Sequence, residues 1–237
     1  NNVTTTVTYD SVGIPSWRTP NSEKIIMSRP EPRWHKKAWI ERHQKFNNRV
    51  KQGNVDLIMI GDSITHWWDT AGKEVWDKYY KKRNAVNLAI SGDRTEHILW
   101  RLENGNIEGI SPKLATLMIG TNNHMSSSPE FTANDIRLIV KKLRSELPKT
   151  KILVLAIFPR GGSDDDSARQ KNMRVNQLIA DIGDSDMVHY LNINETFLNK
   201  RRLRNDLIPD GSHPNEKGYS AWAQALEPTI SKLMGEN

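Results

Sequence analysis

The sequence predicts an α/β protein whose parallel sheet is covered by helices on both sides. From residue 55 onward, short apolar segments rich in β-branched residues recur along the chain. Longer segments with helical periodicity lie between them, which is the pattern of βαβ units. With 237 residues, of which 36% are hydrophobic, the chain is also long enough to bury one large core.

Five segments have the length and composition of buried strands. They are Val55–Ile60, Ala85–Ile90, Leu114–Ile119, Lys151–Ile157 and Met187–Leu191. Strands in parallel sheets are buried on both faces, so they read as continuous apolar runs rather than alternating ones. These five segments therefore predict a five-stranded parallel sheet.

Helical patterns separate these strands and flank them. The expected helices are Trp34–Lys51, Trp67–Tyr80, Thr95–Glu103, Pro129–Leu147 and Ser167–Ile182. A last helix is expected after Pro214, because Trp222, Leu226, Ile230 and Leu233 are spaced for one helical face.

Residues 1–33 show no periodicity and contain Pro15, Pro20, Pro30 and Pro32. Such a segment is typical of an extended arm. No break in composition follows it, so we expect an arm over residues 1–33 and a single domain over residues 34–237.

Composition excludes several classes of protein. The net charge of +6 comes from dispersed basic residues, so no nucleic-acid partner is expected. The chain has no cysteine, which excludes disulfides and thiolate chemistry. The longest apolar run, Ile152–Phe158, is too short for a membrane span. The chain begins at Asn1 rather than Met, which favours a secreted or periplasmic protein over a cytoplasmic one and leaves the compartment open.

Three of the predicted strands are followed by residues that can take part in acyl chemistry. Ser63 follows the first strand, Gly92 the second and Asn122 the third. In open α/β sheets, ligands bind just beyond the carboxyl ends of the strands. Each residue also has a purely structural interpretation: a helix cap for the serine, a turn for the glycine and a loop contact for the asparagine.

A fourth signal, Asp210-Gly211-Ser212-His213, lies before the last helix. An imidazole can take a proton from a serine hydroxyl, and a carboxylate on its other nitrogen fixes the tautomer. The spacing allows Asp210 and His213 to face one site, although a lone loop histidine is more often structural.

Taken together, Ser63, Gly92, Asn122 and the Asp210/His213 pair resemble the motifs of the SGNH hydrolases, also called the GDSL esterase/lipase family. The resemblance covers about residues 55–235. Within the family, residues 92–105 and 119–124 are most similar to the catalytic subunits of platelet-activating-factor acetylhydrolases.

The resemblance implies a three-layer αβα fold of flavodoxin-like type. It also implies Ser63 as nucleophile, His213 as base and Asp210 as its partner. The backbone N–H groups of Ser63 and Gly92 and the side chain of Asn122 would form the oxyanion hole. Candidates to line the substrate cleft are Trp67 (or its neighbour Trp68), Asn123 and His124.

Neither a metal nor a cofactor is expected. His66, His97 and His124 lack the spacing of metal ligands, and Asp164–Asp166 lacks the alternation of a calcium loop.

The expected function is a serine esterase for short-chain esters, with O-acetyl groups on carbohydrates as substrates. One alternative is an acetylhydrolase of phospholipids; another is a basic polysaccharide- or nucleic-acid-binding module with a vestigial site. The expected partner is a small-molecule or glycan ester substrate. The sequence leaves open whether the protein forms a homo-oligomer.

Overall fold

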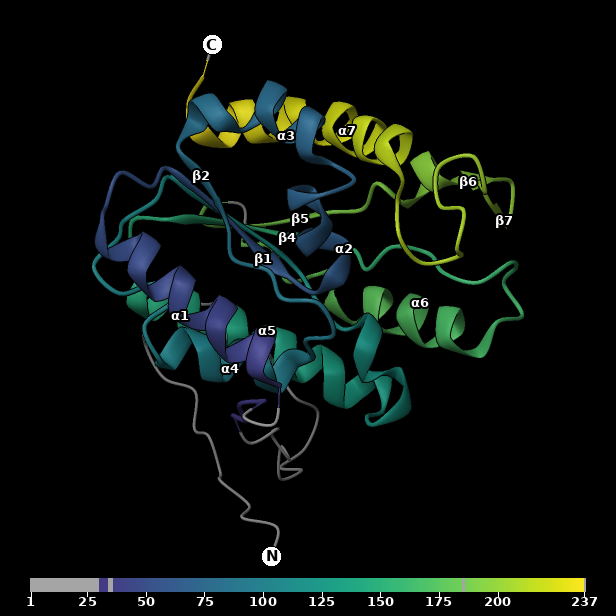
Figure 1. Ribbon diagram of the computed structural model, residues 1–237. Helices are drawn as coiled ribbons and strands as arrows, with labels where there is room; N and C mark the ends of the chain where they lie inside the picture. The colour runs from purple at the N-terminus through teal and green to yellow at the C-terminus, as the bar shows by residue number, and fades with distance from the viewer. Residues whose placement is uncertain (1–29, 34–35, 185, 237) are drawn as a thin grey trace, which may run out of the picture.

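A computed structural model describes residues 30–33, 36–184 and 186–236 of the chain (Figure 1). Five strands form one parallel sheet in the order β2-β1-β3-β4-β5. They are β1 (Leu57–Gly61), β2 (Ala85–Asn87), β3 (Leu114–Met118), β4 (Lys151–Leu155) and β5 (Val188–Leu191). The strand order is that of flavodoxin-like folds, so the predicted fold class is confirmed.

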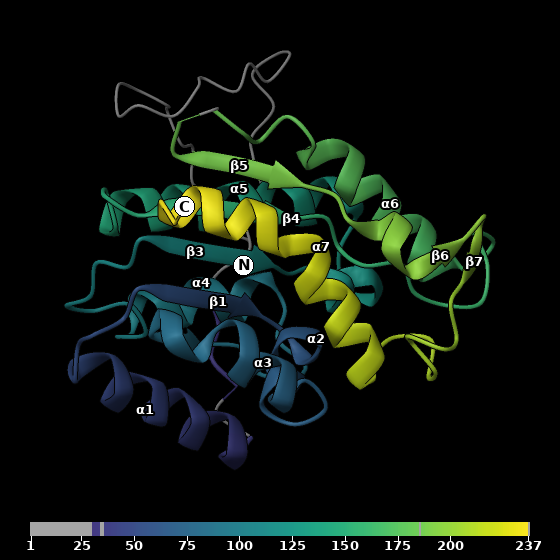
Figure 2. The same cartoon turned by 90° about the horizontal axis from the view of Figure 1, so that it is seen from above.

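Helices cover both faces of the sheet (Figures 1 and 2). One face carries α1 (Lys37–Lys51), α4 (Thr95–Glu103), α5 (Pro129–Glu146) and α6 (Ser167–Ile179). The other carries α2 (Ser63–His66), α3 (Lys73–Tyr79) and α7 (Glu216–Met234). These layers produce the three-layer αβα architecture.

Alternate residues of each strand supply the two cores between sheet and helices. In β1, Ile58 and Ile60 pack on the α1/α4/α5/α6 side, whereas Leu57 and Met59 pack on the α3/α7 side. Successive side chains of a strand point to opposite faces. Both faces of the sheet are therefore buried, as the apolar runs predict.

Two local features differ from the predictions. The helix expected over residues 67–80 is interrupted: a short 3-10 turn, η1 (Trp67–Asp69), precedes α3. A Cβ atom at Gly72 would lie 2.6 Å from the ring of Trp68 and 2.8 Å from that of Tyr219. The chain must therefore pass close to these buried rings, and this tertiary contact takes precedence over helical periodicity.

The second difference is a small antiparallel hairpin, β6 (Leu198–Asn199) and β7 (Arg202–Leu203), at the end of 3-10 turn η4 (Asn194–Phe197). Strands of two residues are too short to produce a periodic signal.

Most of the predicted arm, residues 1–29, lies outside the described residues, as do Trp34 and His35 of the first predicted helix. Within the described parts of the chain, no helix is long and apolar enough to cross a membrane.

Candidate active site

Ser63 lies at the carboxyl end of β1, at the first position of α2. The preceding residue, Asp62, caps this short helix by accepting a hydrogen bond from the backbone N–H of Ile64 at 3.0 Å. Gly61 permits the tight turn, because a Cβ atom there would lie 2.7 Å from the carbonyl oxygen of Met118 on the next strand. The Gly61-Asp62-Ser63 sequence thus places the serine at the edge of the sheet, as the sequence predicts.

The structure brings Ser63, His213 and Asp210 into one chain of hydrogen bonds. Ser63 Oγ lies 2.8 Å from His213 Nε2, and His213 Nδ1 lies 2.8 Å from Asp210 Oδ2. When Nδ1 donates its proton to the carboxylate, Nε2 is left to accept from the hydroxyl. The geometry is that of a nucleophile, a base and an orienting carboxylate.

Asp210 is held as an anion by its surroundings. Partial burial alone would raise the pKa of its carboxyl group. Hydrogen bonds from the backbone N–H and ring of His213 and from the backbone N–H of Ser212 outweigh this effect, so the pKa lies below its ordinary value. The carboxylate is therefore ionised at neutral pH.

Gly92 and Asn122 face a common cavity of about 300 Å³. Gly92 has a φ of +80°, a left-handed conformation that favours glycine. Asn122 lies in 3-10 turn η3 (Thr121–Met125) and donates one amide hydrogen to the carbonyl oxygen of Asp93 at 2.9 Å. An amide nitrogen carries two hydrogens, so the second is available to a bound ligand.

The three candidate cleft residues have different positions. The Trp67 ring stacks on His213, with centroids 4.2 Å apart and planes inclined by 18°. The prediction for Asn123 is corrected: its side chain is 0% exposed and is bonded to Thr95. The His124 ring is half-buried and contacts the carbonyl oxygen of Thr121 within its own turn. Trp68 belongs to the α3/α7 core.

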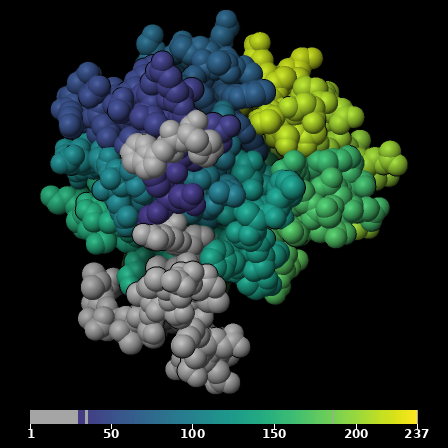
Figure 3. Space-filling model, turned by 60° about the horizontal axis from the view of Figure 1, so that its bottom comes forward, coloured from purple at the N-terminus to yellow at the C-terminus, as the bar shows by residue number. Residues whose placement is uncertain are grey.

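Sequence reasoning missed Arg33. Its Nη1 donates to the carbonyl oxygen of Ser91 at 2.9 Å, and its side chain lines the same cavity as Gly92 and Asn122. The neighbouring Glu31 N–H donates to the carbonyl oxygen of Glu96, which fixes this segment on the start of α4. In Figure 3, the deep purple start of the described chain lies on the teal surface of the domain.

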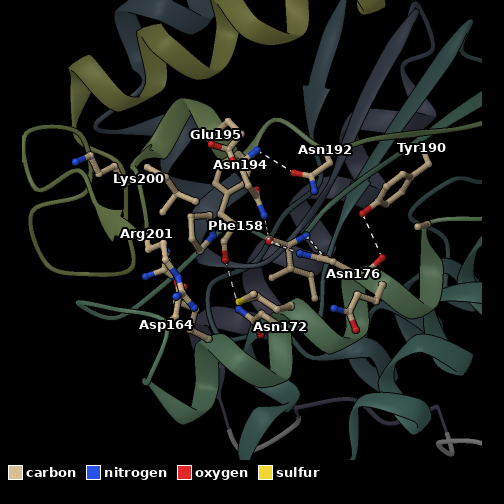
Figure 4. A pocket seen from close by; sticks show the side chains of 17 residues that line it. Phe158, Asp164, Asn172, Asn176, Tyr190, Asn192, Asn194, Glu195, Lys200 and Arg201 are labelled. Atoms are coloured by element: carbon tan, nitrogen blue, oxygen red, sulfur yellow. Dashed lines mark hydrogen bonds and ion pairs between the residues drawn. The ribbon is translucent and has the colours of Figure 1, made fainter.

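A second cavity, of about 420 Å³, lies at the β5 edge between α6 and the η4–β6 segment (Figure 4). Asn172, Asn176, Asn194 and Tyr190 line it, and Lys200 and Arg201 lie at the β6–β7 turn. The loop after β4 contributes Ile157, Phe158 and Pro159 to the lining of this cavity. That loop is tied to the triad segment by a bond from Gly161 N–H to the carbonyl oxygen of Gly211.

The carboxyl group of Asp62 is fully buried, and its burial makes the stability of the fold depend on pH. Burial raises the pKa of its carboxyl group to about 7, with Asp93 adding to the rise and the Ile64 N–H and Arg160 opposing it. The folded state therefore holds this proton up to higher pH than the unfolded state, and the contribution of Asp62 to the free energy of unfolding falls as pH rises from about 4 to about 7.

We therefore expect Asp62→Asn, which keeps a cap acceptor for Ile64, to stabilise the protein at alkaline pH. The gain should be near zero at pH 4 and reach at most about 4 kcal/mol above pH 7. Urea denaturation of both proteins at pH 4, 6 and 8 measures it. A constant difference across this range would contradict the buried-carboxyl explanation.

Among the described residues, no cluster of three or more His, Cys, Asp or Glu side chains is arranged to hold a metal ion.

Comparisons with known proteins agree with this architecture. The sequence profile of the GDSL-like lipase/acylhydrolase family matches residues 59–221. Human platelet-activating factor acetylhydrolase IB subunit alpha1 is 30% identical over 201 residues, covering 84% of this chain and 85% of that protein. The rat alpha2 subunit is 33% identical over 201 residues, covering 84% and 86%.

Two solved structures share the fold at low sequence identity. A GDSL-like lipase from Bacteroides thetaiotaomicron superposes with a TM-score of 0.66 and 19% identity, covering 81% of this chain and 97% of that one. An acetylxylan esterase from Geobacillus stearothermophilus superposes with a TM-score of 0.60 and 19% identity, covering 78% and 96%. At these identities the likeness concerns the fold alone.

Proposed function

This chain belongs to the GDSL-like lipase/acylhydrolase family of ester hydrolases, and we propose that within it the protein is a serine esterase acting on short acyl esters of polar alcohols. The observation that carries the proposal is the hydrogen-bond chain from Ser63 through His213 to Asp210, with 2.8 Å at each step. A helix cap alone would not need an imidazole on the serine hydroxyl.

In the proposed mechanism, Ser63 Oγ attacks the ester carbonyl carbon while His213 Nε2 accepts the hydroxyl proton. The imidazolium then gives this proton to the leaving alcohol, and the acyl group remains on the serine. A water molecule, deprotonated by the same imidazole, releases the acid and restores Ser63. Asp210 holds the ring and stabilises its charged form, since its carboxylate is ionised.

Negative charge develops on the carbonyl oxygen in each half of this reaction. We assign three donors to this oxygen: the backbone N–H groups of Ser63 and Gly92 and the second amide hydrogen of Asn122. Donors fixed before the reaction stabilise the transition state without reorganisation.

Asn122→Ala is expected to lower kcat by about 10²–10³-fold, the cost of one oxyanion donor, with a smaller change in KM. The measurement is steady-state hydrolysis of p-nitrophenyl acetate. Thermal denaturation of the same variant controls for loss of the Asn122–Asp93 hydrogen bond. An unchanged kcat would remove Asn122 from the oxyanion hole.

Acetyl is the acyl group we assign. The curated relatives are named as acetylhydrolases and one structural neighbour as an acetylxylan esterase. Their names share the acetyl group and differ in the alcohol. A small acyl pocket has packed walls, so each added methylene must displace a neighbour.

For the alcohol we favour a carbohydrate over a phospholipid. Among the described residues, the large apolar side chains that are well exposed are Met125 at 86% and Met173 at 43%. A lipid surface is normally met by a contiguous apolar patch of several such residues. The half-buried indole of Trp67 beside His213 is suited to a sugar ring, whose C–H face packs on aromatic rings.

The test is kcat/KM for p-nitrophenyl esters of two to ten carbons, followed by acetate release from acetylated xylan and from an acetylated phospholipid. We expect the maximum at two carbons and release from the glycan. A maximum at eight or more carbons would overturn the short-acyl assignment. Release from the phospholipid alone would overturn the carbohydrate assignment and favour the phospholipid acetylhydrolase.

A further inference from the structure

The peptide bond between Ser91 and Gly92 is the central peptide of a tight turn. The turn spans residues 90–93 and is closed by a hydrogen bond from the Asp93 N–H to the carbonyl oxygen of Ile90 at 3.1 Å. A φ of +80° at Gly92, the third residue, is that of a type II turn. In a type I turn the same central peptide is rotated by about 180°, with little change to the residues on either side.

The orientation of this peptide decides where the Gly92 N–H points. In a trans peptide the carbonyl and the N–H point in opposite directions, and the described residues contain no cis peptide. A group that binds the Ser91 carbonyl oxygen therefore also fixes the Gly92 N–H on the opposite side. Rotation to the type I form would direct a carbonyl oxygen to the place where the N–H now points.

Arg33 is the group that binds this oxygen. Its Nη1 donates to Ser91 O at 2.9 Å and lies 3.8 Å from Asp93 Oδ1. The guanidinium also packs on Gly92, since a Cβ atom there would lie 2.8 Å from Nη1. The Arg33 side chain is 19% exposed. The cation is thus largely shielded from water, where a charge-assisted hydrogen bond is stronger than at the surface.

The buried carboxylate below the turn fixes this arrangement. Asp93 Oδ1 accepts from Trp39 Nε1 at 2.6 Å, and Oδ2 accepts from Arg101 Nε at 2.9 Å. Both residues belong to helices on the α1/α4/α5/α6 face. Asp93 is therefore held in place by two side-chain hydrogen bonds, and its negative charge attracts Arg33 toward the turn.

We infer that Arg33 is a positioning residue for the oxyanion hole. The inference rests on the proposed esterase function. By donating to Ser91 O, Arg33 holds the Ser91–Gly92 peptide in the type II orientation, in which the Gly92 N–H faces the developing oxyanion. Its charge also polarises that peptide and makes the N–H a stronger donor. Arg33 itself need not touch the substrate.

Arg33→Met tests this role, since it removes the donor and the charge but keeps most of the side-chain volume. Arg33→Gln keeps a neutral donor. Arg42→Met is the matched control: Arg42 Nε donates to the carbonyl oxygen of Ala89 at 2.8 Å, in the same loop but outside the turn. For each variant, kcat and KM are measured with the neutral ester p-nitrophenyl acetate, with thermal denaturation as the control for folding.

We expect Arg33→Met to lower kcat about 10- to 100-fold with KM within about twofold, a part of the cost of losing one oxyanion donor. Affinity for a trifluoromethyl ketone, which forms an oxyanion on the serine, should fall by a similar factor. Arg33→Gln should lose less, and Arg42→Met should keep kcat within about twofold.

An unchanged kcat in Arg33→Met, or a rise in KM alone, would overturn the positioning role. The second outcome would indicate direct binding of the substrate by the cation. If Arg33→Met does not fold, a wild-type kcat in Arg33→Leu, which also lacks the donor and the charge, overturns it instead. These results are distinct from failure of the proposed function, which would show as full activity in Ser63→Ala.

Discussion

Ser63→Ala is expected to lower kcat for p-nitrophenyl acetate by about 10⁴–10⁶-fold, the loss seen when a serine hydrolase loses its nucleophile. The reason is that alanine leaves no atom to form the acyl intermediate, while the proposed oxyanion donors stay in place. KM should change much less than kcat. A residual rate above that of water is expected from these remaining donors.

The double variant Ser63→Ala/His213→Ala sharpens this test. His213 acts on the Ser63 hydroxyl, so once the hydroxyl is absent the imidazole has little left to do. The double variant should therefore lose no more than either single variant, because residues that act as a unit are strongly non-additive. Ser220→Ala on α7 controls for the substitution. Wild-type turnover in Ser63→Ala would exclude the serine mechanism; absence of turnover in the wild type would favour a binding module.

The fold follows from local patterns wherever those patterns are long. The amphipathic segment Thr95–Glu103 predicts α4 with its observed bounds, and the apolar runs predict all five strands of the sheet. The interruption before α3 is not visible in the sequence, since it depends on Gly72 meeting the Trp68 and Tyr219 rings. Tyr219 lies more than 140 residues further along the chain.

The position of Ser63 could be predicted because parallel strands end at one edge of the sheet. Asp210 and His213 follow no strand of that sheet, and their spacing before the last helix is the signal for them. Ser63 and His213 are 150 residues apart and still meet there. Asn123 shows the limit of this reasoning. It adjoins Asn122, but successive side chains of a 3-10 turn diverge by about 120°, so one faces the cavity and the other is buried. Arg33 lies in a segment without periodicity, and no sequence signal connects it to Ser91.

Asp210→Asn is expected to lower kcat by about 10⁴-fold, although the two side chains have nearly the same shape. Asp210 Oδ1 accepts hydrogen bonds from the backbone N–H groups of Ser212 and His213 at 2.8 and 2.7 Å. In the asparagine variant the amide oxygen must take this place, because an NH₂ group cannot accept them. The NH₂ group is then turned toward His213 Nδ1.

An amide that donates to Nδ1 requires this nitrogen to be unprotonated, so the ring proton moves to Nε2. The imidazole then presents N–H to Ser63 Oγ, where a base is needed. The tautomer can be read from the ¹⁵N chemical shifts of His213, which should change together with kcat. Asp206→Asn, the same substitution at an exposed carboxylate in this loop paired with Arg204, should leave both unchanged. Activity of Asp210→Asn within about tenfold of wild type would mean that the carboxylate does not set the tautomer.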